Sequence, residues 1–150
     1  MALDQPGVSL RQHRRVALDS CIFIYHLEAY PKYIALTDVV FSWLGDPGSR
    51  AVTSVITMTE VLVPPYRNLD QKLLDNFYAL LSTYPNLEWI SVDLEVADIA
   101  AKVRAQHNLR TPDAIQAATA IHAGATLLIT NDPVFSRIPD FAVLVLDDCI

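Results

Sequence analysis

The sequence of 150 residues has little cysteine and no excess of positive charge. Its two cysteines, Cys21 and Cys149, are too few for a disulfide scaffold and indicate a reducing compartment. Lysine and arginine total 11 against 17 aspartates and glutamates, so the net charge is −6. This balance excludes a strongly basic protein that coats nucleic acid, but it does not exclude nucleic-acid chemistry at a metal site.

The sequence also lacks a long apolar run. The longest weakly polar stretch, residues 114–130, is rich in alanine and is interrupted by Gln116, His122 and Gly124. Alanine inserts poorly into a bilayer, so a buried soluble segment explains this stretch better than a membrane span. Residues 1–15 have no apolar segment of the kind that secretory signals carry. We therefore expect a cytoplasmic protein with no membrane contact.

The signatures of several catalytic classes are missing. The sequence has neither G-x-x-x-x-G-K for phosphate loops nor G-x-G-x-x-G for dinucleotides, and no Ser/His/Asp nucleophile elbow. Asp19 has no second acid two places on, which a haloacid-dehalogenase-like phosphatase needs. The last lysine is Lys102, too early for a phospho-receiver domain.

Short β-rich runs alternate with helical patterns along the chain. Strands are expected at residues 15–18, 51–54, 87–92, 126–130 and 141–146, and helices after Ser20 and at 32–44, 56–63, 69–83, 94–107 and 112–123. This alternation predicts a three-layer α/β/α sandwich around a mostly parallel sheet of four to five strands. The length suits one domain, residues 16–150, preceded by an N-terminal extension, residues 1–15.

Local signals predict where several helices begin and end. Asp93 is expected to cap one helix, and Thr111 is expected to cap another with Pro112 at its first position. Gly124 suits a left-handed stop after that helix. Pro64 and Pro65 are expected to end the helix that starts at Ile56, because proline lacks the backbone donor.

Four acidic residues occur beside the expected strand ends or early in the helices that follow them: Asp19, Glu60, Asp113 and Asp132. Each has apolar neighbours, which is unusual for a solvated surface acid. In open parallel sheets the functional site lies beyond the carboxyl ends of the strands. Carboxylates gathered there raise each other's pKa, and a divalent cation relieves the conflict. An all-oxygen ligand set favours Mg²⁺ or Mn²⁺.

Three of the four acids also have an ordinary structural explanation. Asp19 can cap a helix, Asp113 can interact with a helix dipole, and Asp132 can form a turn beside Pro133. The four together, each at a predicted strand-to-helix crossing, favour a site.

Four further polar residues adjoin these acids and are candidates for contacting phosphate or metal-bound water: Ser20, Arg110, Thr130 and Asn131. The alternatives are a helix cap for Ser20, an exposed ion pair for Arg110, and turn roles for the other two.

The segments around the four acids resemble the motifs of the PIN-domain family, and within it the VapC-type toxins of bacterial toxin–antitoxin pairs. The matching segments are LDSCIFI at 18–24, TSVITMTEVL at 53–62, LRTPDAIQAATA at 109–120 and LITNDPVF at 128–135. The resemblance spans residues 16–146. Two features depart from the family pattern. Cys21 occupies a position at which the family frequently has asparagine, and the net charge is more negative than expected for a chain that must hold RNA.

This resemblance implies a single PIN-like nuclease domain that hydrolyses phosphodiester bonds of single-stranded or looped RNA. It implies Asp19, Glu60, Asp113 and Asp132 as the catalytic and metal-binding acids, with Asp19 and Asp113 as direct ligands of Mg²⁺ or Mn²⁺. It also implies a homodimer and a cognate antitoxin. Two alternatives stay open: a PIN nuclease of RNA processing or DNA cleavage without a toxin role, and a catalytically silent PIN binding module.

Overall fold

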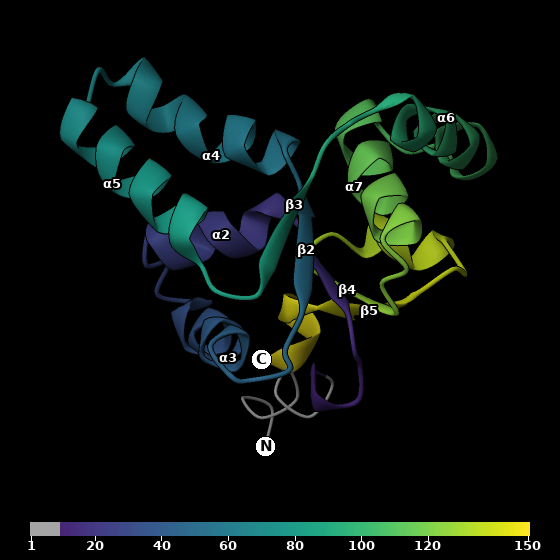
Figure 1. The fold of residues 1–150 in the computed structure, drawn as a ribbon, viewed down its shortest axis with the longest axis horizontal. Helices are drawn as coiled ribbons and strands as arrows, with labels where there is room; N and C mark the ends of the chain where they lie inside the picture. Colours follow the sequence, from purple (N-terminus) through teal and green to yellow (C-terminus); the bar gives the residue numbers. More distant parts are fainter. Residues whose placement is uncertain (1–9) are drawn as a thin grey trace.

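The computed structural model describes residues 10–150 and contains a five-stranded, fully parallel sheet (Figure 1). The strand order is β3-β2-β1-β4-β5. The strands are β1 (Val16–Leu18), β2 (Ala51–Ser54), β3 (Leu87–Ile90), β4 (Leu127–Thr130) and β5 (Ala142–Val145). The predicted parallel sheet is confirmed. Its last strand is shorter than expected, because Leu146 already begins a 3₁₀ turn, η3 (Leu146–Cys149).

Helices cover both faces of the sheet, as the alternating pattern predicts (Figure 1). One face carries α2 (Ser20–Leu27), α3 (Ile34–Leu44), α4 (Ile56–Arg67) and α5 (Gln71–Thr83). The other carries α6 (Leu94–His107) and α7 (Thr111–His122), with the 3₁₀ turn η2 (Pro133–Arg137) beside them. The three-layer α/β/α architecture is therefore confirmed.

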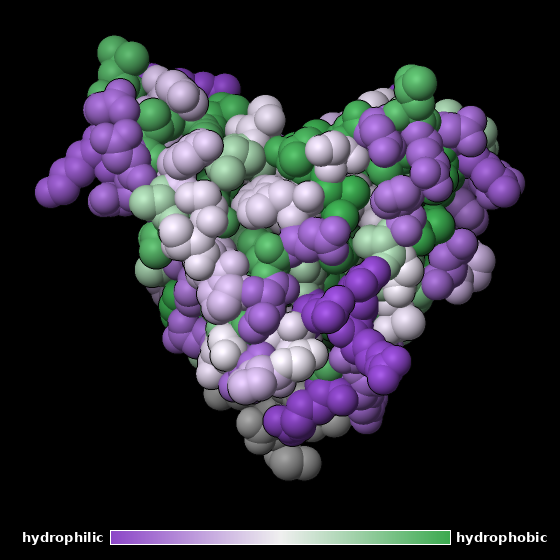
Figure 2. Space-filling model, viewed as in Figure 1, coloured by the Kyte–Doolittle hydropathy of each residue, from purple (hydrophilic) through white to green (hydrophobic). Residues whose placement is uncertain are grey.

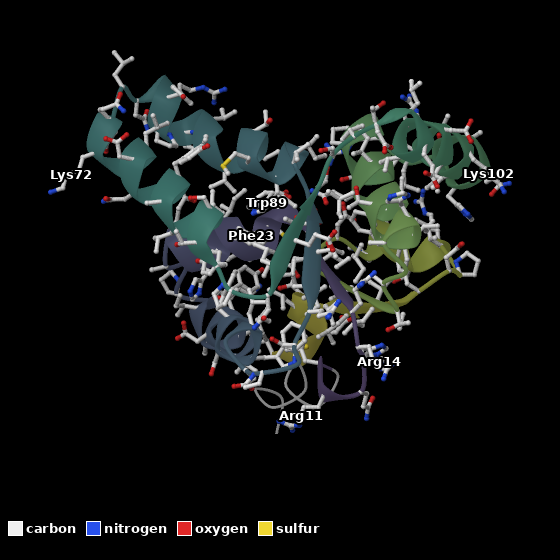
Figure 3. The ribbon with its side chains drawn as sticks, viewed as in Figure 1. Arg11, Arg14, Phe23, Lys72, Trp89 and Lys102 are labelled. Carbon is white, nitrogen blue, oxygen red and sulfur yellow. The ribbon has the colours of Figure 1, made fainter. Side chains whose placement is uncertain are left out.

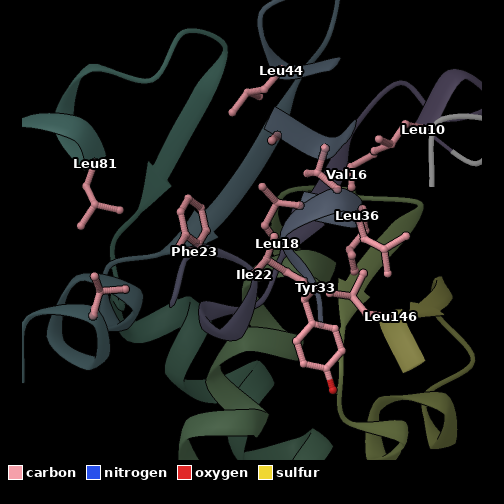
Figure 4. Close-up of a cluster of buried hydrophobic side chains, with 14 of the residues drawn as sticks. Leu10, Val16, Leu18, Ile22, Phe23, Tyr33, Leu36, Leu44, Leu81 and Leu146 are labelled. Atoms are coloured by element: carbon pink, nitrogen blue, oxygen red, sulfur yellow. The ribbon is translucent and has the colours of Figure 1, made fainter. Parts of the chain in front are cut away.

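The strand residues alternate between two hydrophobic cores, because successive side chains of a strand point to opposite faces. In β1, Val16 and Leu18 join the core under α2 to α5, whereas Ala17 joins the core under α6 and α7. Figure 4 shows the first of these cores. Both faces are apolar, as expected for a parallel sheet covered on both sides.

Residues 10–15 lead into β1 and are in part buried. Leu10 is fully buried in the first core, near the start of β1 (Figure 4). The guanidinium of Arg15 donates to the carbonyl of Ala123, at the end of α7. Residues 1–9 of the expected extension lie outside the described residues.

The prediction that Pro64 and Pro65 end α4 is wrong. The helix continues to Arg67, and Asn68 caps it by donating its N–H to the carbonyl of Pro64. A proline ring fixes φ near the helical value, so a further turn is possible once the lost donors are offset elsewhere. Pro65 is buried, and α4 packs along α5 in this region.

The predicted cap of α7 is displaced by one residue. Arg110 is extended (φ −66°, ψ 153°) and occupies the N-cap, so Thr111 is already helical and Pro112 lies within the first turn. The Thr111 hydroxyl accepts a hydrogen bond from Arg104 at 2.5 Å instead of capping. The predicted cap Asp93 and the left-handed Gly124 (φ 70°) are confirmed.

In the described part of the chain, no helix combines the length and apolar character that a membrane span requires.

Candidate active site

The carboxyl ends of the strands point toward a hollow between the α4–α5 arm and the α6–α7 pair. Figure 1 shows β2 and β3 running toward this end, where α4 and α7 begin, and Figure 2 shows the hollow in the surface. Asp19 directly follows β1, and Thr130 is the last residue of β4. Because β1 and β4 are paired neighbours, these two residues meet at the same edge.

Asp19 is the most constrained acid of the site. Its side chain is buried, with 8% exposure. One carboxylate oxygen accepts the backbone N–H of Ser20 at 2.8 Å, which caps α2. The other accepts the hydroxyl of Thr130 at 2.8 Å. The predicted capping role is therefore present, and the same carboxylate is also tied to the neighbouring strand.

Burial raises the pKa of Asp19 to about 6, from an ordinary value of 3.8. Hydrogen bonds from Thr130 and Ser20 oppose this rise, whereas the charges of Glu60 and Asp113 add to it. The repulsion means that acids from β1, α4 and α7 act on one another across the site. The unfavourable charge is of the kind that a bound cation relieves.

The Cys21 thiol lies on the same side, with its sulfur 3.9 Å from Asp19. Burial, and then the charge of Asp19, raises the pKa of this thiol, so it remains protonated near neutral pH. It therefore acts as a weak donor to the carboxylate rather than as a thiolate ligand.

Glu60 reaches the site from the second turn of α4. Its carboxylate accepts the hydroxyl of Ser20 at 2.8 Å. Ser20, predicted as a substrate-binding candidate, thus connects two of the predicted acids: its backbone contacts Asp19 and its side chain contacts Glu60. The residues are 40 positions apart in sequence, so the contact depends on the fold.

Asp113 and Arg110 face each other in the first turn of α7. The guanidinium donates to the Asp113 carboxylate at 3.1 Å, and the exposed fractions are 79% for Arg110 and 14% for Asp113. This hydrogen bond is the main cause that raises the pKa of Arg110, and the charges of Asp132 and Glu60 contribute. An exposed cation therefore lies beside three of the four acids.

The segment after β4 serves structure as well as the site. Asp132 accepts the N–H of Val134 at 2.9 Å and caps η2, which is the predicted turn role. Its own N–H donates to Thr130 at 3.0 Å. The Asn131 amide donates to the Tyr25 hydroxyl and its oxygen accepts the N–H of Asp147, so both of its ends are engaged away from the acids.

A buried polar chain behind the acids was not predicted from the sequence. Thr53 donates to the carbonyl of Leu18 at 2.8 Å, its hydroxyl bonds that of Thr57 at 2.7 Å, and Gln116 donates to Thr57 at 2.9 Å. Thr57 precedes Glu60 by three residues and Gln116 follows Asp113 by three. The two residues of each pair share a helix face, and this three-residue spacing is the sequence signal that could have indicated the row of buried hydrogen bonds.

The donors present fit a hard divalent cation. Within residues 10–150, no three acidic, histidine or cysteine side chains are grouped closely enough to bind one ion directly in this arrangement. Mg²⁺, however, keeps several waters and is commonly held by one or two carboxylates. A buried carboxylate with a raised pKa, repelled by two further acids, matches that requirement.

The parallel sheet with acids at its carboxyl edge defines an α/β protein with a candidate site built from carboxylates. Comparison with family models gives the family: the PIN domain matches residues 16–140. The chain therefore belongs to the PIN domain family. Comparison with the curated proteins found no match.

Several solved structures share the fold. A toxin–antitoxin complex from Klebsiella pneumoniae has 23% identity and a TM-score of 0.68, covering 87% of this chain and 97% of that one. VapBC-1 from nontypeable Haemophilus influenzae has 23% identity and a TM-score of 0.67, with coverage of 89% and 98%. VapBC2 from Rickettsia felis, bound to a promoter DNA fragment, has 17% identity and a TM-score of 0.66, with coverage of 87% and 98%.

Proposed function

We propose that this protein is a divalent-metal-dependent endoribonuclease that cleaves single-stranded or looped RNA and acts as the toxin of a toxin–antitoxin pair. The observation that carries the proposal is the arrangement of Asp19, Glu60, Asp113 and Asp132. They come from separate parts of the chain and lie around one edge of the sheet. The negative charges of Glu60 and Asp113 contribute to the raised pKa of the buried Asp19. The PIN domain family membership supports a nuclease.

Asp19 and Asp113 would hold Mg²⁺ or Mn²⁺, with Glu60 and Asp132 closing the site or holding water. When bound, the cation would lower the pKa of the attacking water and offset the charge that develops on the scissile phosphate. Thr130 and the Ser20 N–H fix the orientation of Asp19. Ser20 likewise fixes Glu60 through its hydroxyl.

Glu60 or Asp132 would position or deprotonate the attacking water. The exposed Arg110 can exchange its contact with Asp113 for a phosphate oxygen, since its side chain is largely in solvent. Thr130 acts through Asp19, and Asn131 holds the loop after β4. Because water attacks rather than the ribose 2′-hydroxyl, the products are a 5′-phosphate and a 3′-hydroxyl.

The partners of this proposal are a cognate antitoxin and a second copy of the chain. The similar structures from Klebsiella pneumoniae, Haemophilus influenzae and Rickettsia felis are toxin–antitoxin or VapBC assemblies by their names. Their agreement over most of both chains supports the same kind of partner here.

The test is cleavage of a labelled RNA pool by purified protein with Mg²⁺, with Mn²⁺ or with EDTA. We expect cleavage only with metal, and loss of at least about 100-fold in Asp19→Asn and Asp113→Asn. Asp98→Asn is the matched control, because Asp98 is exposed on α6. Equal cleavage in EDTA, or full activity in both site variants, would contradict the nuclease proposal. A metal-binding protein without any cleavage would favour a silent binding module.

The toxin role has a separate test in cells. Induced expression of the wild-type chain should arrest growth, whereas Asp113→Asn should not. Metal-dependent cleavage without growth arrest would favour a PIN nuclease of RNA processing.

A further inference from the structure

A cluster of arginines lies at the end of the molecule opposite the acids. Arg14 and Arg15 precede β1, and Arg50 precedes β2, so all three lie at the amino ends of the central strands. Together with Gly48 and Gly124 they line a hollow of about 500 Å³. We call Arg14, Arg15 and Arg50 the arginine end. An adjacent hollow of about 350 Å³ shares Arg15 and Arg50, and Glu88 is its acidic member.

The charges of this end are not compensated within the described chain. Among residues 10–150, no carboxylate lies within salt-bridge distance of Arg14, Arg15 or Arg50. Arg15 is engaged by the Ala123 carbonyl, but Arg14 and Arg50 are exposed and have no hydrogen-bonded partner in that part of the chain. Their guanidinium groups are available to an anion from outside.

This concentration is unusual in a chain with a net charge of −6. The rest of the chain has an even larger excess of negative charge, so positive charges that gather in one place favour the binding of a polyanion there. Figure 2 shows strongly hydrophilic side chains in the lower part of the molecule, at the end opposite the hollow of the candidate site. Figure 3 shows Arg14 and Arg11 at that lower end, directed away from the body.

We propose that the arginine end is a second RNA-binding site, which holds the phosphodiester backbone of a substrate strand at a distance from the acids. This inference rests on the proposed function. Guanidinium groups match phosphate oxygens in pairs, and the cluster contains arginine only. Contacts with the backbone carry no sequence information, so this site supplies affinity and direction while the acidic edge supplies the cleavage.

The geometry sets the length of RNA that the two sites need. Arg15 and Asp19 are four residues apart along an extended strand, or about 13 Å at roughly 3.3 Å per residue. A nucleic-acid strand advances about 3.4 Å per nucleotide in a helix, so at least about four nucleotides separate the sites. A 2-nucleotide RNA at the acidic edge is therefore too short to reach the arginine end, whereas a 20-nucleotide RNA reaches both.

The experiment compares Arg14→Gln/Arg50→Gln with Lys72→Gln/Lys102→Gln, which removes the same charge from exposed lysines on α5 and α6 (Figure 3). Binding of labelled 2-nucleotide and 20-nucleotide single-stranded RNAs is measured in EDTA between 50 and 200 mM NaCl. For the arginine variant we expect about tenfold weaker binding of the 20-mer at 50 mM, and a salt slope smaller by about 1.4. Binding of the 2-nucleotide RNA should be the same in the arginine variant as in wild type, and the lysine variant should bind both RNAs as wild type does.

Unchanged 20-mer binding by the arginine variant would overturn the proposal. An equal loss in both double variants, or for both RNA lengths, would overturn it too, because the effect would then be one of net charge. Competition by 5 mM inorganic phosphate as strong as that by RNA would assign the end to free phosphate instead. Cleavage of the 20-mer by wild type with Mg²⁺ is measured in parallel. Cleavage with unchanged binding refutes only the arginine end, whereas arginine-dependent binding without cleavage refutes only the nuclease.

Discussion

At the scale of single residues, the ionised form of Asp19 is unfavourable in the folded chain. Its pKa of about 6 exceeds the ordinary value of 3.8, so between these values the folded chain binds a proton that the unfolded chain does not. The free energy of unfolding therefore rises as pH falls through 6 toward 4. The two pKa values differ by about 2, which corresponds to about 3 kcal/mol.

Asp19→Asn removes this unfavourable charge while keeping an acceptor for Thr130 or Ser20. We expect the variant to be more stable than wild type in EDTA at pH 8, by up to about 3 kcal/mol, and the difference to vanish near pH 4. Urea unfolding at several pH values measures it. A variant that is less stable at every pH would contradict the raised pKa.

Thr130 is the residue whose hydroxyl favours the ionised form of Asp19. Thr130→Val keeps the shape and removes the donor, so the pKa of Asp19 should rise further. We expect the acidic limb of the pH–activity profile to move to higher pH, with about fivefold less activity near pH 6 for a rise of one in pKa. Thr59→Val, at an exposed position of α4, is the control. A uniform loss at all pH values would mean that Thr130 has a purely structural role.

The residue types of the site were predictable, but their contacts were not. Apolar neighbours and the strand ends indicated the four acids. The hydrogen bond of Ser20 to Glu60 and the engagement of Asn131 by Tyr25 join residues 40 and 106 positions apart, and sequence patterns carry no information on such pairs.

At the scale of elements, α4 and α7 are held together behind the acids by the Gln116–Thr57 hydrogen bond. Gln116 is buried, with 3% exposure, and Thr57 is fully buried. Since Glu60 and Asp113 lie one turn away on the same helices, this bond sets the spacing of the two acids. Gln116 and Thr57 are positioning residues.

Gln116→Leu should lower the free energy of unfolding by about 1 kcal/mol, and its effect on turnover should be larger. We expect kcat to fall about tenfold or more while KM for RNA changes little, since the variant moves acids without touching the strand. Gln71→Leu, at an exposed position of α5, is the control. Full turnover at a temperature where Gln116→Leu is folded would show that the bond serves packing only.

The boundaries of elements follow local chemistry except where tertiary contacts override it. Asp93 and Gly124 act as their residue types predict. Pro64 and Pro65 do not end α4, which continues to Arg67 with Pro65 buried and α5 packed against it. Thr111 does not cap α7, and its hydroxyl instead accepts a hydrogen bond from Arg104. In each case the deciding neighbour is close in space but lies on another element.

At the scale of the whole molecule, the parallel sheet was predictable because short β-rich runs alternate with helical patterns along the chain, and the two apolar cores on its faces agree with this. The strand order and the burial of Leu10 were not, since they depend on which elements meet. The resulting molecule carries acids at the carboxyl edge of its sheet and arginines at the amino edge. Under the two proposals, a negatively charged chain would bind RNA at the arginine end and cleave it at the acidic edge.

The most direct test of the account is Mn²⁺ binding at pH 7.5, measured by calorimetric titration of wild type, Asp19→Asn, Asp113→Asn and the Asp98→Asn control. If Asp19 and Asp113 hold the cation, wild type and the control bind Mn²⁺, and each site variant binds it at least about tenfold more weakly. Equal Mn²⁺ affinity in all four proteins, or no binding by wild type, would contradict a metal site at the acidic edge.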